Sequence, residues 1–125
     1  MGTRKALQFA NDRKRLQADR SIPFTATVAS VNTPVSVWTP SSATARFRFM
    51  GAAFSTSIAS VAPSFKDGSA PSAFYSPGKF NAVNQSVERW LGRGYLSASA
   101  NNDLRIDSDV PGATFTGSVF GREEP

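Results

Sequence analysis

Residues 46–56 have the sequence RFRFMGAAFST, and this stretch decides the fold. Phe47 and Phe49 alternate with two arginines, a period of two that puts the phenylalanines on one face of a β-strand and the arginines on the other. The strand is expected to continue to residue 56. Gly51, inside the strand, predicts a bulge or a point where another backbone approaches closely.

Similar patterns on both sides of this stretch predict further strands, because apolar residues alternate there with Ser and Thr. Turn-forming pairs such as Asp67-Gly68 and Pro77-Gly78 separate them. The further expected strands cover residues 24–31, 35–38, 60–66, 72–76, 95–98, 104–107 and 113–120. The sequence therefore predicts an all-β fold, a single small β-sandwich or jelly-roll-like barrel of about seven or eight short antiparallel strands.

Two segments depart from this pattern. Residues 1–22 are expected to form a basic N-terminal arm, partly helical or extended, that ends at Ile22-Pro23 because a residue before proline avoids the helical region. Residues 23–125 then form the β-sandwich domain. Within it, the spacing of the apolar residues in the stretch 81–92 predicts a short helix or an ordered loop.

The composition excludes several kinds of chemistry. The chain of 125 residues has no cysteine and no histidine. This rules out disulfides, thiol nucleophiles, Cys-ligated zinc and every catalytic triad that needs histidine. No apolar run reaches the roughly 18–20 residues of a membrane span. We therefore expect no cofactor, no metal and no membrane partner.

The net charge of +5 is concentrated near the N-terminus. Residues 1–20 contain six Lys and Arg and two Asp, a net charge of +4, which leaves +1 for residues 21–125. A basic arm on a nearly neutral domain could bind nucleic acid, an anionic membrane or an acidic protein surface, or could be merely solvated. We favour an acidic protein surface and expect no direct contact with nucleic acid. The residues predicted to bind the partner are Arg4, Lys5, Arg13, Lys14, Arg15 and Arg20 by charge, and Leu7, Phe9 and Leu16 as apolar anchors.

An acid-rich stretch, NNDLRIDSD at residues 101–109, raises the question of calcium, which takes six to eight oxygen ligands. Leu104 and Ile106, however, alternate with charged residues, which puts Asp103 and Asp107 on the solvent face of a strand. The flanking residues then form turns, and we predict no metal site.

Two other patterns are explained better by structure than by chemistry. The carboxylates of the domain could in principle pair for glycoside hydrolysis, but none lies in a recognisable aromatic-lined motif. Gly92-Arg93-Gly94, with Arg89 and Trp90, could contact phosphate, but the domain lacks the basic footprint of a nucleic-acid-binding protein. We expect a glycine-rich turn with Trp90 packed beneath it, and no catalytic residue.

Aromatic residues are numerous, with ten Phe, two Trp and two Tyr. The core of a two-layer sandwich is expected to hold roughly eight or nine of them. In residues 113–120, Phe115 and Val119 share one face while Thr116 and Phe120 share the other. The aromatics left outside the core, together with faces rich in Ser, Thr and Ala, predict contacts between subunits.

Several of these stretches resemble small β-sandwich virion proteins of tailed bacteriophages and prophages. The similar stretches are Val35-Ser36-Val37-Trp38-Thr39-Pro40, residues 45–55, Phe65-Lys66-Asp67-Gly68 and residues 113–124. The resemblance covers roughly residues 28–124. It implies a non-enzymatic protein of the virion, a capsid decoration or cement protein or a head or tail accessory protein, which is often trimeric. Its partners would be the major capsid protein or other virion proteins, and it would lie on the capsid surface.

Two alternatives remain open at this point. One is a tail, connector or head-fibre component of the same kind of particle. The other is a carbohydrate-binding β-sandwich, in which Trp38, Trp90, Tyr75 and Tyr95 would form a platform for stacking sugars.

Overall fold

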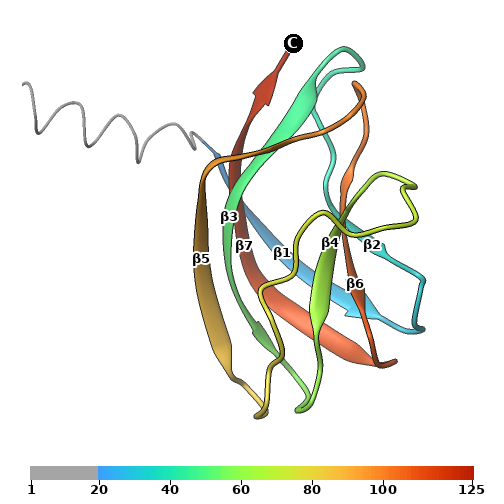
Figure 1. The fold of residues 1–125 in the computed structure, drawn as a ribbon, viewed down its shortest axis with the longest axis vertical. Helices are drawn as coiled ribbons and strands as arrows, with labels where there is room; N and C mark the ends of the chain where they lie inside the picture. Colours follow the sequence, from blue (N-terminus) through green and yellow to red (C-terminus); the bar gives the residue numbers. More distant parts are fainter. Residues whose placement is uncertain (1–19) are drawn as a thin grey trace, which may run out of the picture.

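The computed structural model describes residues 20–125, which form two antiparallel sheets facing each other (Figure 1). The strands are β1 (Arg20–Val28), β2 (Val35–Trp38), β3 (Arg46–Thr56), β4 (Pro63–Asp67), β5 (Ser86–Leu96), β6 (Leu104–Ser108) and β7 (Ala113–Glu124). One sheet has the order β1-β7-β3-β5 and the other has the order β2-β6-β4. The described residues contain no helix, so the predicted all-β fold is confirmed.

The central strand β3 has the bounds and the alternation that its sequence predicts. Phe47 and Phe49 are both fully buried against the second sheet. Phe49 pairs with Gly121 and Gly51 pairs with Phe120, so Met50 is one extra residue on β3, a β-bulge. The bulge shifts the inward-facing positions by one, which is why the next buried aromatic residue is Phe54.

The two sheets enclose a core made largely of phenylalanine. Phe54 lies at its centre, with ring centroids 5.4–5.9 Å from four other phenylalanines. Toward the far end of the core, Phe49 packs on Phe65 at 4.8 Å. Trp38 from the second sheet lies against Gly121 of β7, where a Cβ atom would be 2.7 Å from the indole ring. The buried core contains eight aromatic residues, as predicted, and Phe74, Tyr75 and Tyr95 are partly buried against it.

The structure corrects three boundaries. In the stretch 81–92 there is no helix, and the alternative of an ordered loop holds only for residues 81–85, a turn in which the φ of Asn84 is +63°; residues 86–92 belong to β5. Residues 72–76 form no strand and make only an isolated bridge between Tyr75 and Phe65. Strand β1 begins at Arg20 and not after Pro23, so residues 20–22 belong to the sheet.

Candidate functional site

The face of the four-stranded sheet that points away from the core has a distinctive composition. Strand alternation and register place small, uncharged residues over most of it. Its members are Ser21, Pro23, Thr25 and Thr27 of β1, Thr114, Thr116, Ser118 and Phe120 of β7, Gly51, Ala53 and Ser55 of β3, and Ser86, Glu88 and Trp90 of β5. We call this set the neutral face, because Glu88 is its single charged residue. The sequence-based division of residues 113–120 into two faces is confirmed.

Two aromatic rings stand at one end of the neutral face. Trp90 and Phe120 stack with centroids 4.6 Å apart and planes within 6° of parallel. Both residues pair with Gly51, which lies between them on β3, and a Cβ atom there would come within 2.5 Å of the Arg89 carbonyl oxygen. Because Gly51 has no side chain, the rings of Trp90 and Phe120 can stack across β3, which lies between their two strands. Trp90 is 53% exposed, the largest aromatic surface that the described residues present to solvent.

The predicted position of Trp90 beneath a glycine-rich turn is wrong. Between the pairs Gly51–Trp90 and Phe49–Tyr95, four residues of β5 oppose the single residue Met50 of β3. Gly92 and Gly94 adopt φ values of +61° and +71° inside this long bulge. The bulge leaves Trp90 in the regular part of β5, where alternation turns its side chain outward.

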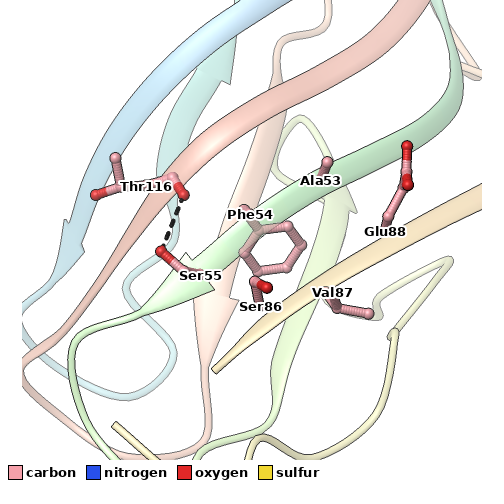
Figure 2. Close-up of a pocket in the computed structure, with 7 residues that line it drawn as sticks. All are labelled: Ala53, Phe54, Ser55, Ser86, Val87, Glu88 and Thr116. Atoms are coloured by element: carbon pink, nitrogen blue, oxygen red, sulfur yellow. Dashed lines mark hydrogen bonds between the residues drawn. The ribbon is translucent and has the colours of Figure 1, made fainter. Parts of the chain in front are cut away.

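A shallow depression of about 420 Å³ lies on the same sheet, over β3, β5 and β7 (Figure 2). It is lined by Ala53, Phe54, Ser55, Ser86, Val87, Glu88 and Thr116. The Ser55 hydroxyl donates to the Thr116 carbonyl across its floor, at 3.4 Å. Glu88 is the one titratable group in the lining, and it accepts a 3.4 Å hydrogen bond from the Trp90 indole. The depression thus offers hydroxyls and apolar surface for contact, without a second carboxylate beside Glu88.

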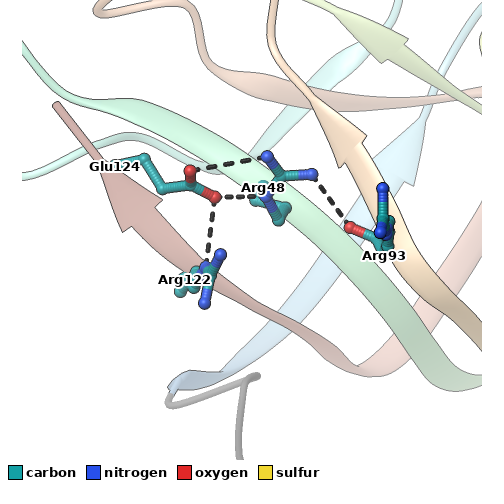
Figure 3. A network of polar contacts seen from close by, with 4 residues as sticks. All are labelled: Arg48, Arg93, Arg122 and Glu124. Atoms are coloured by element: carbon teal, nitrogen blue, oxygen red, sulfur yellow. Dashed lines mark hydrogen bonds and ion pairs between the residues drawn. The ribbon is translucent and has the colours of Figure 1, made fainter. Parts of the chain in front are cut away.

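Beyond the aromatic pair, the same face becomes rich in arginine (Figure 3). Arg48 and Arg122 lie directly opposite each other on β3 and β7. The Glu124 carboxylate bridges them: it accepts from Arg48 Nε and Nη2 and from Arg122 Nε, the last at 3.1 Å. Arg48 Nη1 also donates to the Arg93 carbonyl oxygen at 3.0 Å. We call Arg48, Arg93 and Arg122 the arginine end of the face.

The neighbouring carboxylate, Glu123, ties the same end of β7 to two other parts of the chain. It accepts hydrogen bonds from the Ser41 backbone N–H and from the Ser41 hydroxyl, the latter at 2.6 Å, and pairs with Arg20 at 3.1 Å. Arg20, predicted as a docking residue, therefore begins β1 and forms an ion pair within the domain. The other eight predicted partner-binding residues lie outside the described residues.

Acid is expected to weaken the fold through these two carboxylates. Hydrogen bonds from Arg48, then from Arg122, lower the pKa of Glu124 below its ordinary 4.5, and the Ser41 hydroxyl lowers the pKa of Glu123. A lowered folded-state pKa stabilises the protein above the unfolded-state pKa, and this stabilisation is lost as pH falls through the folded-state value. Glu124→Gln should cost about 1 kcal/mol at pH 7 and flatten the decline in unfolding free energy as pH falls below 4.5. Urea titrations at several pH values test this, with Glu88→Gln as the control; parallel curves for wild type and Glu124→Gln would contradict it.

The acid-rich stretch 101–109 has a structural role. Leu104 and Ile106 point into the core, as predicted. The opposite face is not open to solvent: the Asp107 side chain is only 6% exposed and pairs with Lys66 at 2.9 Å. Asp103 accepts from Arg105 at 3.0 Å. Among residues 20–125, no group of three Asp or Glu lies close enough to hold a metal ion.

The four aromatics proposed as a sugar platform do not share a surface. Trp38 is 4% exposed, and Tyr75 and Tyr95 pack against the core. Trp90 alone of the four lies on an exposed face, so the prediction of this four-residue platform is wrong.

Comparisons with known proteins identify no relative. No family model, curated protein or solved structure matches the chain. In the described part of the chain, no helix is long and apolar enough to span a membrane. The fold and the face define the class of protein: an antiparallel β-sandwich whose four-stranded sheet has an almost uncharged outer face with one stacked aromatic pair at its end.

Proposed function

We propose that this protein is a non-enzymatic structural component of a phage particle, a decoration protein that binds the capsid surface. The observation that carries the proposal is the exposed Trp90–Phe120 pair on the neutral face. Removing charged groups from water costs far more than removing Ser, Thr or Ala, so a face with one carboxylate can be buried against another protein at low cost. The sequence resemblance to virion β-sandwich proteins supports the particle as the setting.

The aromatic pair would be the energetic centre of the contact. Tryptophan is among the residues most often found to dominate binding energy at interfaces, usually surrounded by weaker contacts that exclude water. Trp90 is held rigid by the stack on Phe120 and by the hydrogen bond to Glu88, so little side-chain entropy remains to be lost on binding. The small residues around it let a flat partner surface approach closely.

The partners in this proposal are the shell and further copies of this chain. Copies joined at a local symmetry axis, as a trimer, would place several faces and several basic arms on neighbouring capsid subunits at once. Linked contacts of this kind raise total affinity without any single strong interface. Each bound copy would stabilise the assembled shell by mass action.

Trp90→Ser is expected to weaken binding to undecorated particles by roughly 30-fold, since losing an interface centre costs about 2 kcal/mol. Binding is measured by co-sedimentation with particles from the organism that carries the gene. Val83→Ser is the matched control, because Val83 is 58% exposed but lies in the loop before β5, outside the neutral face. Equal occupancy for wild type and Trp90→Ser would contradict the proposal.

The number of copies per particle decides where on the particle the protein acts. Hundreds of copies are expected for a decoration protein, whereas about a dozen would indicate a tail, connector or head-fibre position. Quantitative mass spectrometry of purified particles gives this number, and absence of the protein from particles would overturn the virion assignment.

A further inference from the structure

The described positive charge is gathered at one end of the four-stranded sheet. Seven charged residues lie where β1 and β3 begin and β7 ends, with a net charge of +3: Arg20, Arg46, Arg48, Arg93, Arg122, Glu123 and Glu124. The other described charged residues are four basic and five acidic, a net charge of −1. Residues 1–19, which carry five basic and two acidic groups, join the sheet at this same end. One end of the molecule therefore attracts anions while the remainder does not.

The arginine end already holds one carboxylate in a defined geometry. Glu124 accepts from Arg48 through two nitrogen atoms and from Arg122 through one (Figure 3). Two guanidinium groups thus hold a single carboxylate, and the Arg93 backbone carbonyl holds the first of them in place. Within residues 20–125, neither the Nη atoms of Arg122 nor the exposed guanidinium of Arg93 donates to any carboxylate or carbonyl. These remaining donors have the planar geometry that binds carboxylates in pairs.

We infer that the arginine end is a carboxylate-binding site through which this protein docks on an acidic protein surface, with the Trp90–Phe120 pair as the apolar anchor beside it. The inference rests on the proposed function in taking the partner to be a protein, and it specifies that partner's charge. Arginine and tryptophan are both enriched among the residues that dominate protein interfaces.

A nucleic-acid partner fits the same face less well. Phosphate groups follow one another along a strand and need a track of cations. The neutral face has no Lys or Arg, and its single charge, Glu88, lies next to Trp90 and would repel a phosphate there. The cations of this outer face are confined to one end of it, which suits a local acidic patch and not a continuous backbone.

Binding of the full chain to poly-L-glutamate, measured by fluorescence anisotropy at several NaCl concentrations, tests the inference. Arg93→Gln should weaken binding about 5-fold and reduce the salt dependence. Lys79→Gln is the matched control: it removes the same charge from an exposed loop residue away from this end, and should change binding less than 2-fold. Glu124→Gln should tighten binding about 3-fold because it removes the internal carboxylate, whereas Glu88→Gln, with the same charge change, should have a smaller effect.

Equal losses of affinity for poly-L-glutamate in Arg93→Gln and Lys79→Gln would overturn the inference, because binding would then depend only on net charge. Tighter binding of an oligo-dT of equal charge, weakened by Trp90→Ser, would also overturn it in favour of nucleic acid. Thermal melting of each variant shows whether it is folded. The proposed function fails separately, through absence from particles or through full particle binding by Trp90→Ser, so the two failures are distinguishable.

Discussion

Phe54→Ala is expected to lower the free energy of unfolding by about 3–5 kcal/mol, the usual cost of deleting a buried phenylalanine. Phe54 is 3% exposed and its ring contacts those of Phe24, Phe65, Phe80 and Phe115. These four rings come from both sheets and from the loop before β5. They cannot all move into the space left by one ring, so a cavity would remain at the point where the two sheets meet.

Phe120→Ala is the matched control, because it deletes the same side chain from the outer face. Its ring has one main aromatic contact, with Trp90, and we expect a loss of about 1 kcal/mol. Urea denaturation of both variants gives the comparison, with the slope of the transition unchanged and only the midpoint shifted. Similar losses of unfolding free energy in the two variants would mean that Phe54 is not at the centre of the core.

The sequence predicts the fold well where a strand keeps a strict alternation. In β3 the order of aromatic and arginine residues defined the strand bounds and the buried face, and Gly51 indicated the irregularity that the structure shows beside it. In β7 the division into two faces predicted that Phe120 points away from the core. Both strands are central in their sheet, so tertiary contacts reinforce the local pattern.

Strand β5 shows why other parts could not be predicted. The four-residue bulge after Trp90 interrupts its alternation and makes Trp90 and Leu91 adjacent apolar residues. Together with Val83 and Val87 they have the spacing of a helix. The strand is held by its pairing with β3, a contact between residues about 40 positions apart that no local window contains. The partner of Trp90, Phe120, is on yet another strand, and only Gly51 between them could have signalled the stack.

The arginine end could not be predicted from the sequence, for the same reason. The net charge of +1 for residues 21–125 is an average over residues that the fold separates. Arg48, Arg93 and Arg122 are far apart in the chain, and pairing of β3 with β5 and β7 brings them to one end. Composition could locate the basic segment at the N-terminus, but only the strand register shows that the sheet adds cations where that segment joins it.

Asp67→Ala is expected to cost about 3 kcal/mol, because three part-buried donors would lose the charged group that accepts from them. Asp67 is 5% exposed and accepts from the Tyr95 hydroxyl at 2.8 Å, the Ala98 N–H at 2.7 Å and the Asn102 amide at 2.9 Å. These bonds fasten the end of β4 to the end of β5 and to the loop that leads into β6. Asp67 is thus a polar connection between the two sheets.

Asp67→Asn separates the loss of hydrogen bonds from the loss of charge. An asparagine can accept from Tyr95 and Ala98 through its carbonyl oxygen and donate to Asn102, whose amide can rotate to present its oxygen. We therefore expect Asp67→Asn to retain most of the stability that Asp67→Ala loses. Equal destabilisation by both substitutions, measured by urea denaturation, would show that the charge and not the hydrogen bonding is required.

The pKa of Tyr95 provides a second measurement that general damage to the fold would not reproduce. Burial, followed by the hydrogen bond and the charge of Asp67, raises the pKa of Tyr95 from 10.0 to about 12. A raised folded-state pKa contributes stability that is fully present below the unfolded-state value and is lost as pH rises through the folded-state value, here between about pH 10 and pH 12. In Asp67→Asn the charge is gone but burial remains, so the pKa should fall only part of the way toward 10. Tyrosinate absorbance during an alkaline titration follows this change, and an unaltered titration in Asp67→Asn would mean that burial alone sets the pKa of Tyr95.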